Sequence, residues 1–223
     1  MVTGGFEEEE IAIFLSRLNQ ASACIDIGSN IGLYTCIAAS KGKRVVAIEP
    51  LARNLRFLYR NIEMNSFQQV EVFPLGLSSK VGIERIYGSG TGASLVAGWS
   101  GASRSSYDLV PVTMLDNILA GRFDGAALLI KMDVEGFELE VLRGADRILN
   151  MRPRPTWLVE ICLSENCPPG HNEKFRATFE LFSRYGYKAT VADSSERVVE
   201  AADVQRWIDN GSIDFGSHNY LFS

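Results

Sequence analysis

Two acidic residues stand where short apolar runs give way to turns. Asp26 lies next to the glycine turn GSNIG (28–32), and Glu49 follows the run RVVAI, 23 residues further on. Glycines between a strand and a helix let a ligand approach the backbone closely. The turn has G-x-x-x-G spacing rather than G-x-G-x-x-G, and the Asp26 carboxylate beside it disfavours a diphosphate. A ligand with an ammonium and a sulfonium group and no phosphate fits better, which points to S-adenosylmethionine, with Glu49 placed to accept hydrogen bonds from its ribose.

A second group of charged residues occurs in the segment KMDVEGFE (131–138). In a strand, Lys131, Asp133 and Glu135 share a parity, so two acids and a base come together where the strand ends. The carboxyl edge of an open α/β sheet is where ligands bind. Two structural alternatives stay open, because Glu135 could serve only to cap the following helix and Lys131 only to neutralise one acid.

If S-adenosylmethionine donates its methyl group to a hydroxyl, a base must remove the hydroxyl proton, which typically accelerates such a step about 10²–10⁴-fold. The candidates are Asp133, Glu135, Glu160 at the end of the run LVE, and His171 in the loop beyond it. Asp133, Glu135 and Glu160 could instead gather a divalent cation, since Mg²⁺ and Mn²⁺ prefer carboxylate oxygens. The spacing does not require this, and we expect no metal.

The elements that would position these residues alternate between strand and helix. Helices are predicted at 1–22, 30–39, 51–62, 114–119, 137–149, 175–185 and 201–209, and strands at 23–27, 44–48, 70–75, 107–112, 127–132, 157–161, 187–192 and 219–222. Successive strand and helix pairs predict an α/β fold with a parallel sheet and right-handed crossovers. We expect one domain that spans residues 1–223.

The segment 88–106 interrupts this alternation. It contains five glycines and six serines and has no periodicity. Loops longer than about 12–15 residues are often functional, so we predict a loop that serves as a lid over the substrate, with a merely mobile excursion as the alternative.

Composition narrows the range of partners. The 223 residues carry a net charge of −5 and 46% hydrophobic residues, which is typical of a globular protein and disfavours nucleic acid or a membrane as partner. The four cysteines form no C-x-x-C pair and predict free thiols, and with no leader or membrane-spanning segment recognised we expect a cytoplasmic protein. The oligomeric state is open.

Three stretches, IDIGSNIGLYTCIAA, VVAIEPLARNLRFLYRNIEMN and KMDVEGFELEVLRGA followed by LVEI, resemble the FkbM family of S-adenosylmethionine-dependent methyltransferases. The resemblance runs from about residue 23 to the end. It implies a Rossmann-like class I methyltransferase fold, with a seven-stranded, mostly parallel sheet, an antiparallel last strand and helices on both faces. It also implies conversion of the cofactor to S-adenosylhomocysteine and O-methylation of a sugar or secondary metabolite.

The resemblance also assigns residues to the cofactor. It places Asp26, Gly28, Asn30 and Gly32 at its methionine side, with Ser29 where alanine is common, and Glu49 at its ribose. Asp133 would lie beside the transferred methyl group, with Glu135 and Gly136 in the pocket wall. No acid follows the third strand, so the backbone or Ser78 would bind the adenine.

Two other functions remain as alternatives. One is a nicotinamide-dependent oxidoreductase of Rossmann type, which the spacing of the glycines and Asp26 disfavour. The other is a catalytically silent ligand-binding domain that has kept the sheet. The chemistry expected is therefore methyl transfer to a small hydroxylated acceptor, whose identity the sequence does not give.

Overall fold

The computed structural model describes residues 6–119, 121–167, 170–215 and 217–223. Its helices are α1 (Phe6–Gln20), α2 (Leu33–Ser40), α3 (Ala52–Met64), α4 (Leu115–Leu119), α5 (Glu138–Arg143), α6 (Asp146–Leu149), α7 (Phe175–Arg184) and α8 (Ala201–Asn210), with 3-10 turns at Gly90–Gly92 and Trp99–Gly101. Its strands are β1 (Ala23–Ile27), β2 (Arg44–Ile48), β3 (Val70–Phe73), β4 (Gly76–Leu77), β5 (Gly82–Tyr87), β6 (Tyr107–Thr113), β7 (Leu128–Met132), β8 (Thr156–Glu160), β9 (Ala189–Val191), β10 (Val198–Val199) and β11 (Asn219–Phe222).

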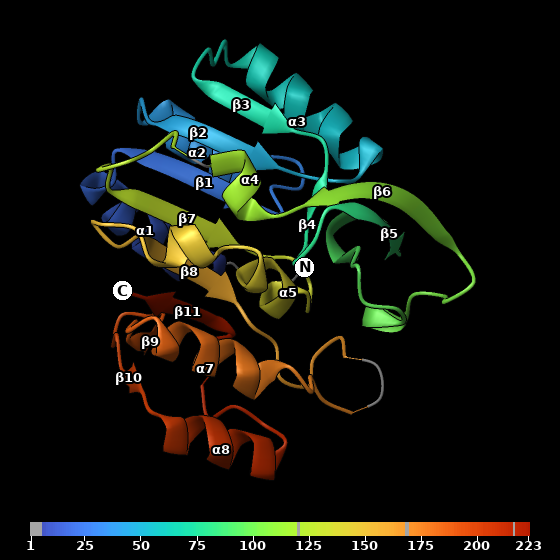
Figure 1. Cartoon of the computed structure of the whole chain (residues 1–223), viewed down its shortest axis with the longest axis vertical. Helices are drawn as coiled ribbons and strands as arrows, with labels where there is room; N and C mark the ends of the chain where they lie inside the picture. The colour runs from blue at the N-terminus through green and yellow to red at the C-terminus, as the bar shows by residue number, and fades with distance from the viewer. Residues whose placement is uncertain (1–5, 120, 168–169, 216) are drawn as a thin grey trace.

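Eight strands form the main sheet in the order β10-β9-β11-β8-β7-β1-β2-β3 (Figure 1). Strands β3, β2, β1, β7 and β8 are parallel, and β11 is antiparallel to both β8 and β9. The predicted parallel sheet with an antiparallel last strand is confirmed. The added strand is β10, a two-residue strand at the edge.

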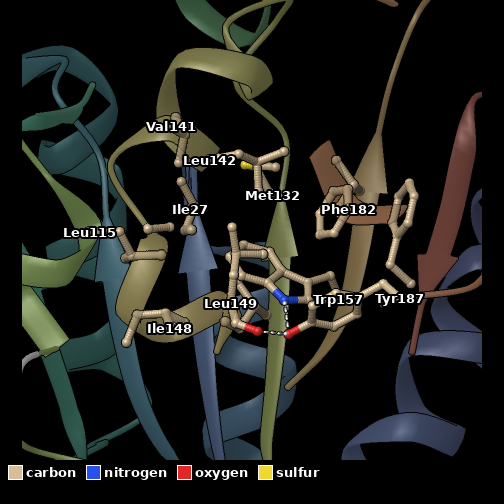
Figure 2. Close-up of a cluster of buried hydrophobic side chains, with 14 of the residues drawn as sticks. Ile27, Leu115, Met132, Val141, Leu142, Ile148, Leu149, Trp157, Phe182 and Tyr187 are labelled. Carbon is tan, nitrogen blue, oxygen red and sulfur yellow. Dashed lines mark hydrogen bonds between the residues drawn. The ribbon is translucent and has the colours of Figure 1, made fainter. Parts of the chain in front are cut away.

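The sheet is covered on both faces. Helices α1, α2 and α3 pack on one face, where Phe14, Leu18 and Leu58 are fully buried. Helices α4 to α8 supply the opposite layer, whose core surrounds Trp157 of β8 (Figure 2). There the indole N–H of Trp157 donates to the Tyr187 hydroxyl at 3.4 Å, so even the polar atom of this ring is paired. A strand buried on both faces explains the continuous apolar runs of the sequence.

Three predicted elements differ in detail from the structure: the strand at 107–112 and the loop at 88–106 are present, whereas the helix 137–149 is interrupted. The predicted strand at 107–112 belongs to a separate three-stranded sheet of order β4-β6-β5, beside the main sheet. The predicted helix 137–149 is two short helices, α5 and α6, divided at Gly144. A side chain on Gly144 would lie 2.3 Å from the Ser78 carbonyl oxygen, so the close approach of this backbone explains the glycine and the break. The loop 88–106 contains two short 3-10 turns. Residues 1–5 of the predicted first helix lie outside the described residues.

Candidate active site

A pocket with a cavity volume of about 60 Å³ opens at the carboxyl ends of β1, β2 and β7. Its walls combine residues that follow these strands with residues of β4, β5 and the segment after β5. The lining residues are Ile27, Gly28, Asn30, Ile48, Glu49, Pro50, Leu51, Asn54, Leu75, Gly76, Leu77, Ile86, Gly90, Ala93, Leu95, Asp133, Val134 and Glu135. They include three carboxylates and no lysine, arginine or histidine, so the pocket favours a cation and disfavours a diphosphate.

The turn after β1 is shaped by the glycine at its start. Gly28 has a φ of 77°, and a Cβ atom built there would lie 1.8 Å from the carbonyl oxygen of Asp133. The Gly28 N–H donates to the Ile48 carbonyl of β2 at 3.0 Å. The missing side chain therefore lets the ends of β1, β2 and β7 come together around one pocket.

Glu49 is held in place by three donors. The backbone N–H groups of Asn30 and Leu51 each donate to its carboxylate at 2.9 Å, and the Asn54 side chain donates at 3.2 Å. Burial raises the pKa of Glu49, and the three hydrogen bonds oppose that rise. The result is a carboxylate with a fixed orientation and spare acceptor capacity in the pocket wall. Sequence reasoning missed Asn54, whose signal is its place in the first turn of α3, directly after Glu49 and the end of β2.

Glu135 lies in the second wall of the pocket, which is formed by Asp133, Val134 and Glu135 after β7, and several contacts constrain it. Its φ is 53°, a strained value for a residue other than glycine, and strain of this kind is concentrated at functional sites. The Trp99 indole N–H donates to its carboxylate at 2.5 Å, and the Ser94 hydroxyl donates to its carbonyl at 2.6 Å. Burial and the nearby charge of Asp133 raise the pKa of Glu135 to about 7. Segment 88–106 thus lies directly against this wall.

Trp99 explains the glycine at 136. The ring is 2% exposed, and a Cβ atom on Gly136 would lie 2.3 Å from it. Nothing local in the sequence relates Trp99 to Glu135, which lies 36 positions further along the chain. That the loop acts as a lid stays a prediction.

Another charged group lies on the sheet face that packs against α1 and α2. Lys131 is 2% exposed, and its ammonium lies 3.2 Å from the Glu10 carboxylate and 3.5 Å from the Asn219 side-chain oxygen. Asn219 also donates to Glu10 at 3.0 Å. Burial alone would lower the pKa of Lys131, but the charges of Asp133, Glu10 and Glu160 outweigh it and raise that pKa.

The structure brings five of the predicted residues to the pocket: Gly28, Asn30, Glu49, Asp133 and Glu135. Glu160 belongs to the same sheet edge, because the register pairs Met132 with Val159 and so sets Asp133 beside Glu160. Burial and the charge of Asp133 raise the pKa of Glu160 to about 8. His171 is exposed in the loop before α7.

Several predicted cofactor residues lie outside the pocket lining. Asp26 faces α2, where it is 2% exposed and accepts a hydrogen bond from the Thr35 hydroxyl at 2.5 Å. Burial raises its pKa to about 6, against the effect of that hydrogen bond. The three carboxylates that line the pocket, and not Asp26, would therefore repel a diphosphate. The strand period accounts for this position, because Asp26 points to the opposite face of β1 from Ile27, which lines the pocket.

Three further residues that we predicted to bind the cofactor also lie outside the pocket lining. Ser29 is buried without lining the pocket, Gly32 directly precedes α2 with Leu58 packed against it, and Ser78 lies against Gly144. Leu75, Gly76 and Leu77 form the wall that we assigned to Ser78. In the part of the chain that the structure describes, no group of three or more His, Cys, Asp or Glu side chains is placed to hold a metal ion.

Comparison with solved structures defines the class of the fold. An O-methyltransferase from Bacillus cereus in complex with SAH superposes with a TM-score of 0.55 over all of this chain and 81% of that one, at 14% identity. Methyltransferase FkbM from Methylobacillus flagellatus KT gives a TM-score of 0.52 over 91% of this chain and 43% of that one, at 23% identity. The fold is that of class I methyltransferases.

The sequence places the chain within that class. Residues 26–189 match the Methyltransferase FkbM domain, and the chain belongs to this family. The hexuronic acid methyltransferase AglP of Haloferax volcanii is 30% identical over 145 residues, which are 64% of this chain and 58% of that relative. The chain thus spans little more than half the length of this curated relative.

Proposed function

We propose that the protein transfers a methyl group from S-adenosylmethionine to a hydroxyl oxygen of a sugar or a related secondary metabolite. The observation that carries the proposal is the composition of the pocket, with three carboxylates, no cationic side chain and walls of leucine and isoleucine. Membership of the FkbM family and the match to a hexuronic acid methyltransferase support the type of reaction and the class of acceptor.

The residues of the pocket fit this cofactor. Glu49 can accept hydrogen bonds from ribose hydroxyls, and the apolar side chains of Leu51, Leu75 and Leu77 offer a slot for a flat base. The side-chain oxygen of Asn30 is buried in the same wall without a hydrogen-bond partner, which suits a donor such as the amino group of the methionine part. When bound, S-adenosylmethionine supplies an electrophilic methyl group.

We assign the removal of the hydroxyl proton to Glu135. Its pKa of about 7 suits a general base near neutral pH, and one carboxylate oxygen accepts from Trp99 while the other is available. Asp133 would orient the acceptor and, through its charge, keep the pKa of Glu135 high. Glu160, with a pKa of about 8, is the alternative base, whereas the exposed position of His171 argues against a role in this step.

A transfer assay tests this proposal. Methyl uptake from labelled S-adenosylmethionine would be followed across a panel of neutral sugars, hexuronic acids and hydroxylated metabolites. Asp133→Asn and Glu135→Gln should each lose transfer by at least about 10²-fold while still binding S-adenosylhomocysteine. Asp108→Asn, which changes an exposed acid of β6, is the matched control and should behave as wild type.

Three outcomes would contradict the proposal. Full transfer by Glu135→Gln would remove this residue from the reaction, and transfer of hydride to or from NAD would favour the oxidoreductase alternative. Binding of the cofactor without methyl uptake by any acceptor of the panel would favour the silent ligand-binding domain.

A further inference from the structure

The outer face of α3 carries a stripe of arginines and large apolar side chains. Arg53, Arg56, Phe57, Arg60 and Met64 follow one another at helical spacing and so lie on one side of the helix. All five are exposed, with Phe57 at 45% and Met64 at 72%. The outermost face of a surface helix normally carries polar residues, so two large apolar side chains there call for a partner.

The three arginines of this stripe have no acidic partner. Among the ion pairs and side-chain hydrogen bonds of the described residues, none involves Arg53, Arg56 or Arg60. The one acid of the helix, Glu63, lies at the edge of the stripe. In a chain with a net charge of −5, this is a local concentration of unpaired positive charge.

The apolar surface continues beyond the helix. The Asn61 side chain donates to the Ile31 carbonyl at 2.8 Å, which ties the turn before α2 to α3. Ile31 and Leu33 at this junction are 46% and 49% exposed, and with Asn61 they line a groove between the two helices. Figure 1 shows α3 at the outer edge of the molecule, beyond the last strand of the main sheet.

We propose that the stripe on α3, together with Ile31 and Leu33, docks on the surface of a bilayer that contains anionic lipids. A helix with arginines and exposed apolar residues on one face matches the interfacial kind of membrane contact, in which the apolar tips enter the headgroup boundary and the cations meet phosphates. The stripe lies along one exposed helix and carries long flexible cations, which suits a deformable bilayer better than the shaped face of an acidic protein. No described helix is long and apolar enough to cross a membrane, so the contact is peripheral.

This inference revises the expectation that the protein has no membrane partner. That expectation rested on the net charge of the whole chain, which averages the basic stripe with acids located elsewhere. Asn54 and Leu51, at the start of α3, line the pocket. The helix of 13 residues is about 20 Å long, so docking would hold the pocket close to the bilayer. The inference stands whether or not the proposed methyl transfer is correct.

Flotation with lipid vesicles tests the proposal on the full chain. Vesicles of phosphatidylcholine alone are compared with vesicles that also contain phosphatidylglycerol. We expect binding only to the second kind, weakened by salt. The triple variant R53Q/R56Q/R60Q should bind roughly a hundredfold more weakly, since each basic residue near an anionic surface strengthens binding roughly fivefold. Phe57→Ser with Met64→Ser should also weaken it.

A control with the same change in charge makes the result specific. R104Q/R147Q/R184Q removes three exposed arginines from other parts of the surface and should bind as wild type. All of these positions are exposed, so circular dichroism and thermal unfolding should show folded variants. The proposal is overturned if wild type does not bind the anionic vesicles, as for a stripe that serves a protein or a nucleic acid. It is also overturned if the control loses as much binding as the α3 variant.

Discussion

Replacing Trp99 by phenylalanine isolates one interaction at the second wall of the pocket. The phenyl ring can still cover Gly136, but it cannot donate the hydrogen bond that the indole N–H makes to the Glu135 carboxylate at 2.5 Å. That hydrogen bond favours the charged form of Glu135 and holds its pKa below the value that burial and Asp133 would otherwise produce. The variant should therefore raise the pKa of Glu135 further.

The size of the shift follows from the strength of the lost interaction. A hydrogen bond to a charged group contributes about 1.5–3 kcal/mol, and one pKa unit corresponds to about 1.4 kcal/mol. Because the Glu135 side chain is partly exposed, water replaces some of the loss. We expect the pKa of Glu135 to rise by about one unit above its value of about 7.

Carbon NMR of protein labelled at the glutamate carboxyl carbons measures this pKa without knowledge of the acceptor, and Glu135→Gln identifies the signal. Asp133→Asn is the opposite perturbation, because it removes the charge that raises the pKa of Glu135, and should lower it. The pH profile of methyl transfer should move in the same direction as the pKa of Glu135 in each variant, because a general base works only when it is deprotonated. If the pKa of Glu135 in Trp99→Phe is unchanged or lower, the Trp99 indole does not stabilise the charged form of Glu135.

Three further predictions concern stability. Gly28→Ala should lower the free energy of unfolding by at least about 2 kcal/mol and weaken cofactor binding in calorimetry, because the new Cβ atom would collide with the Asp133 carbonyl oxygen. Gly42→Ala is the control, since Gly42 also has a positive φ but has open space around it, and it should lower the free energy of unfolding less. Equal losses in the two variants would contradict the role of this close contact. Glu138 is buried with its pKa raised from 4.5 to about 7, so its contribution to stability is full below about pH 4.5 and is lost as pH rises through 7. In wild type the free energy of unfolding should therefore fall by about 3 kcal/mol between pH 4.5 and 7. Glu138→Gln should remove most of this fall, which melting curves recorded across the same pH range would show. Lys131→Met should cost about 3–5 kcal/mol in denaturant unfolding by leaving Glu10 unpaired, and adding Glu10→Gln should recover most of it; no recovery would argue against the pair.

Much of the fold follows from local patterns in the sequence. Apolar runs that end at glycine or at an acid predicted β1, β2 and β7, and two strand and helix units in series predicted the parallel sheet. The carboxyl edge of that sheet is a consequence of the connectivity. For this reason the sequence predicts Gly28, Glu49 and Asp133 at one sheet edge, and all three line the pocket there.

The rest depends on contacts between distant segments. Nothing near Lys131 indicates that its partner is Glu10, which lies on the first helix. Strand β5 carries exposed apolar residues such as Ile83, at 69%, so it lacks the alternation that marks a half-buried strand. Asp26 was assigned to the ligand because it precedes the glycine turn, but the strand period directs its side chain to Thr35.

Binding of S-adenosylmethionine in the acidic pocket at the ends of β1, β2 and β7 can be measured by thermal shift without knowledge of the acceptor. S-adenosylhomocysteine at a hundred times its dissociation constant should stabilise the protein by about 2.7 kcal/mol, which raises the melting temperature by roughly 5–10 °C. NAD should give no shift, and Glu49→Gln should reduce the response to S-adenosylhomocysteine. A shift with NAD and none with S-adenosylhomocysteine would show that the pocket binds a dinucleotide and not S-adenosylmethionine.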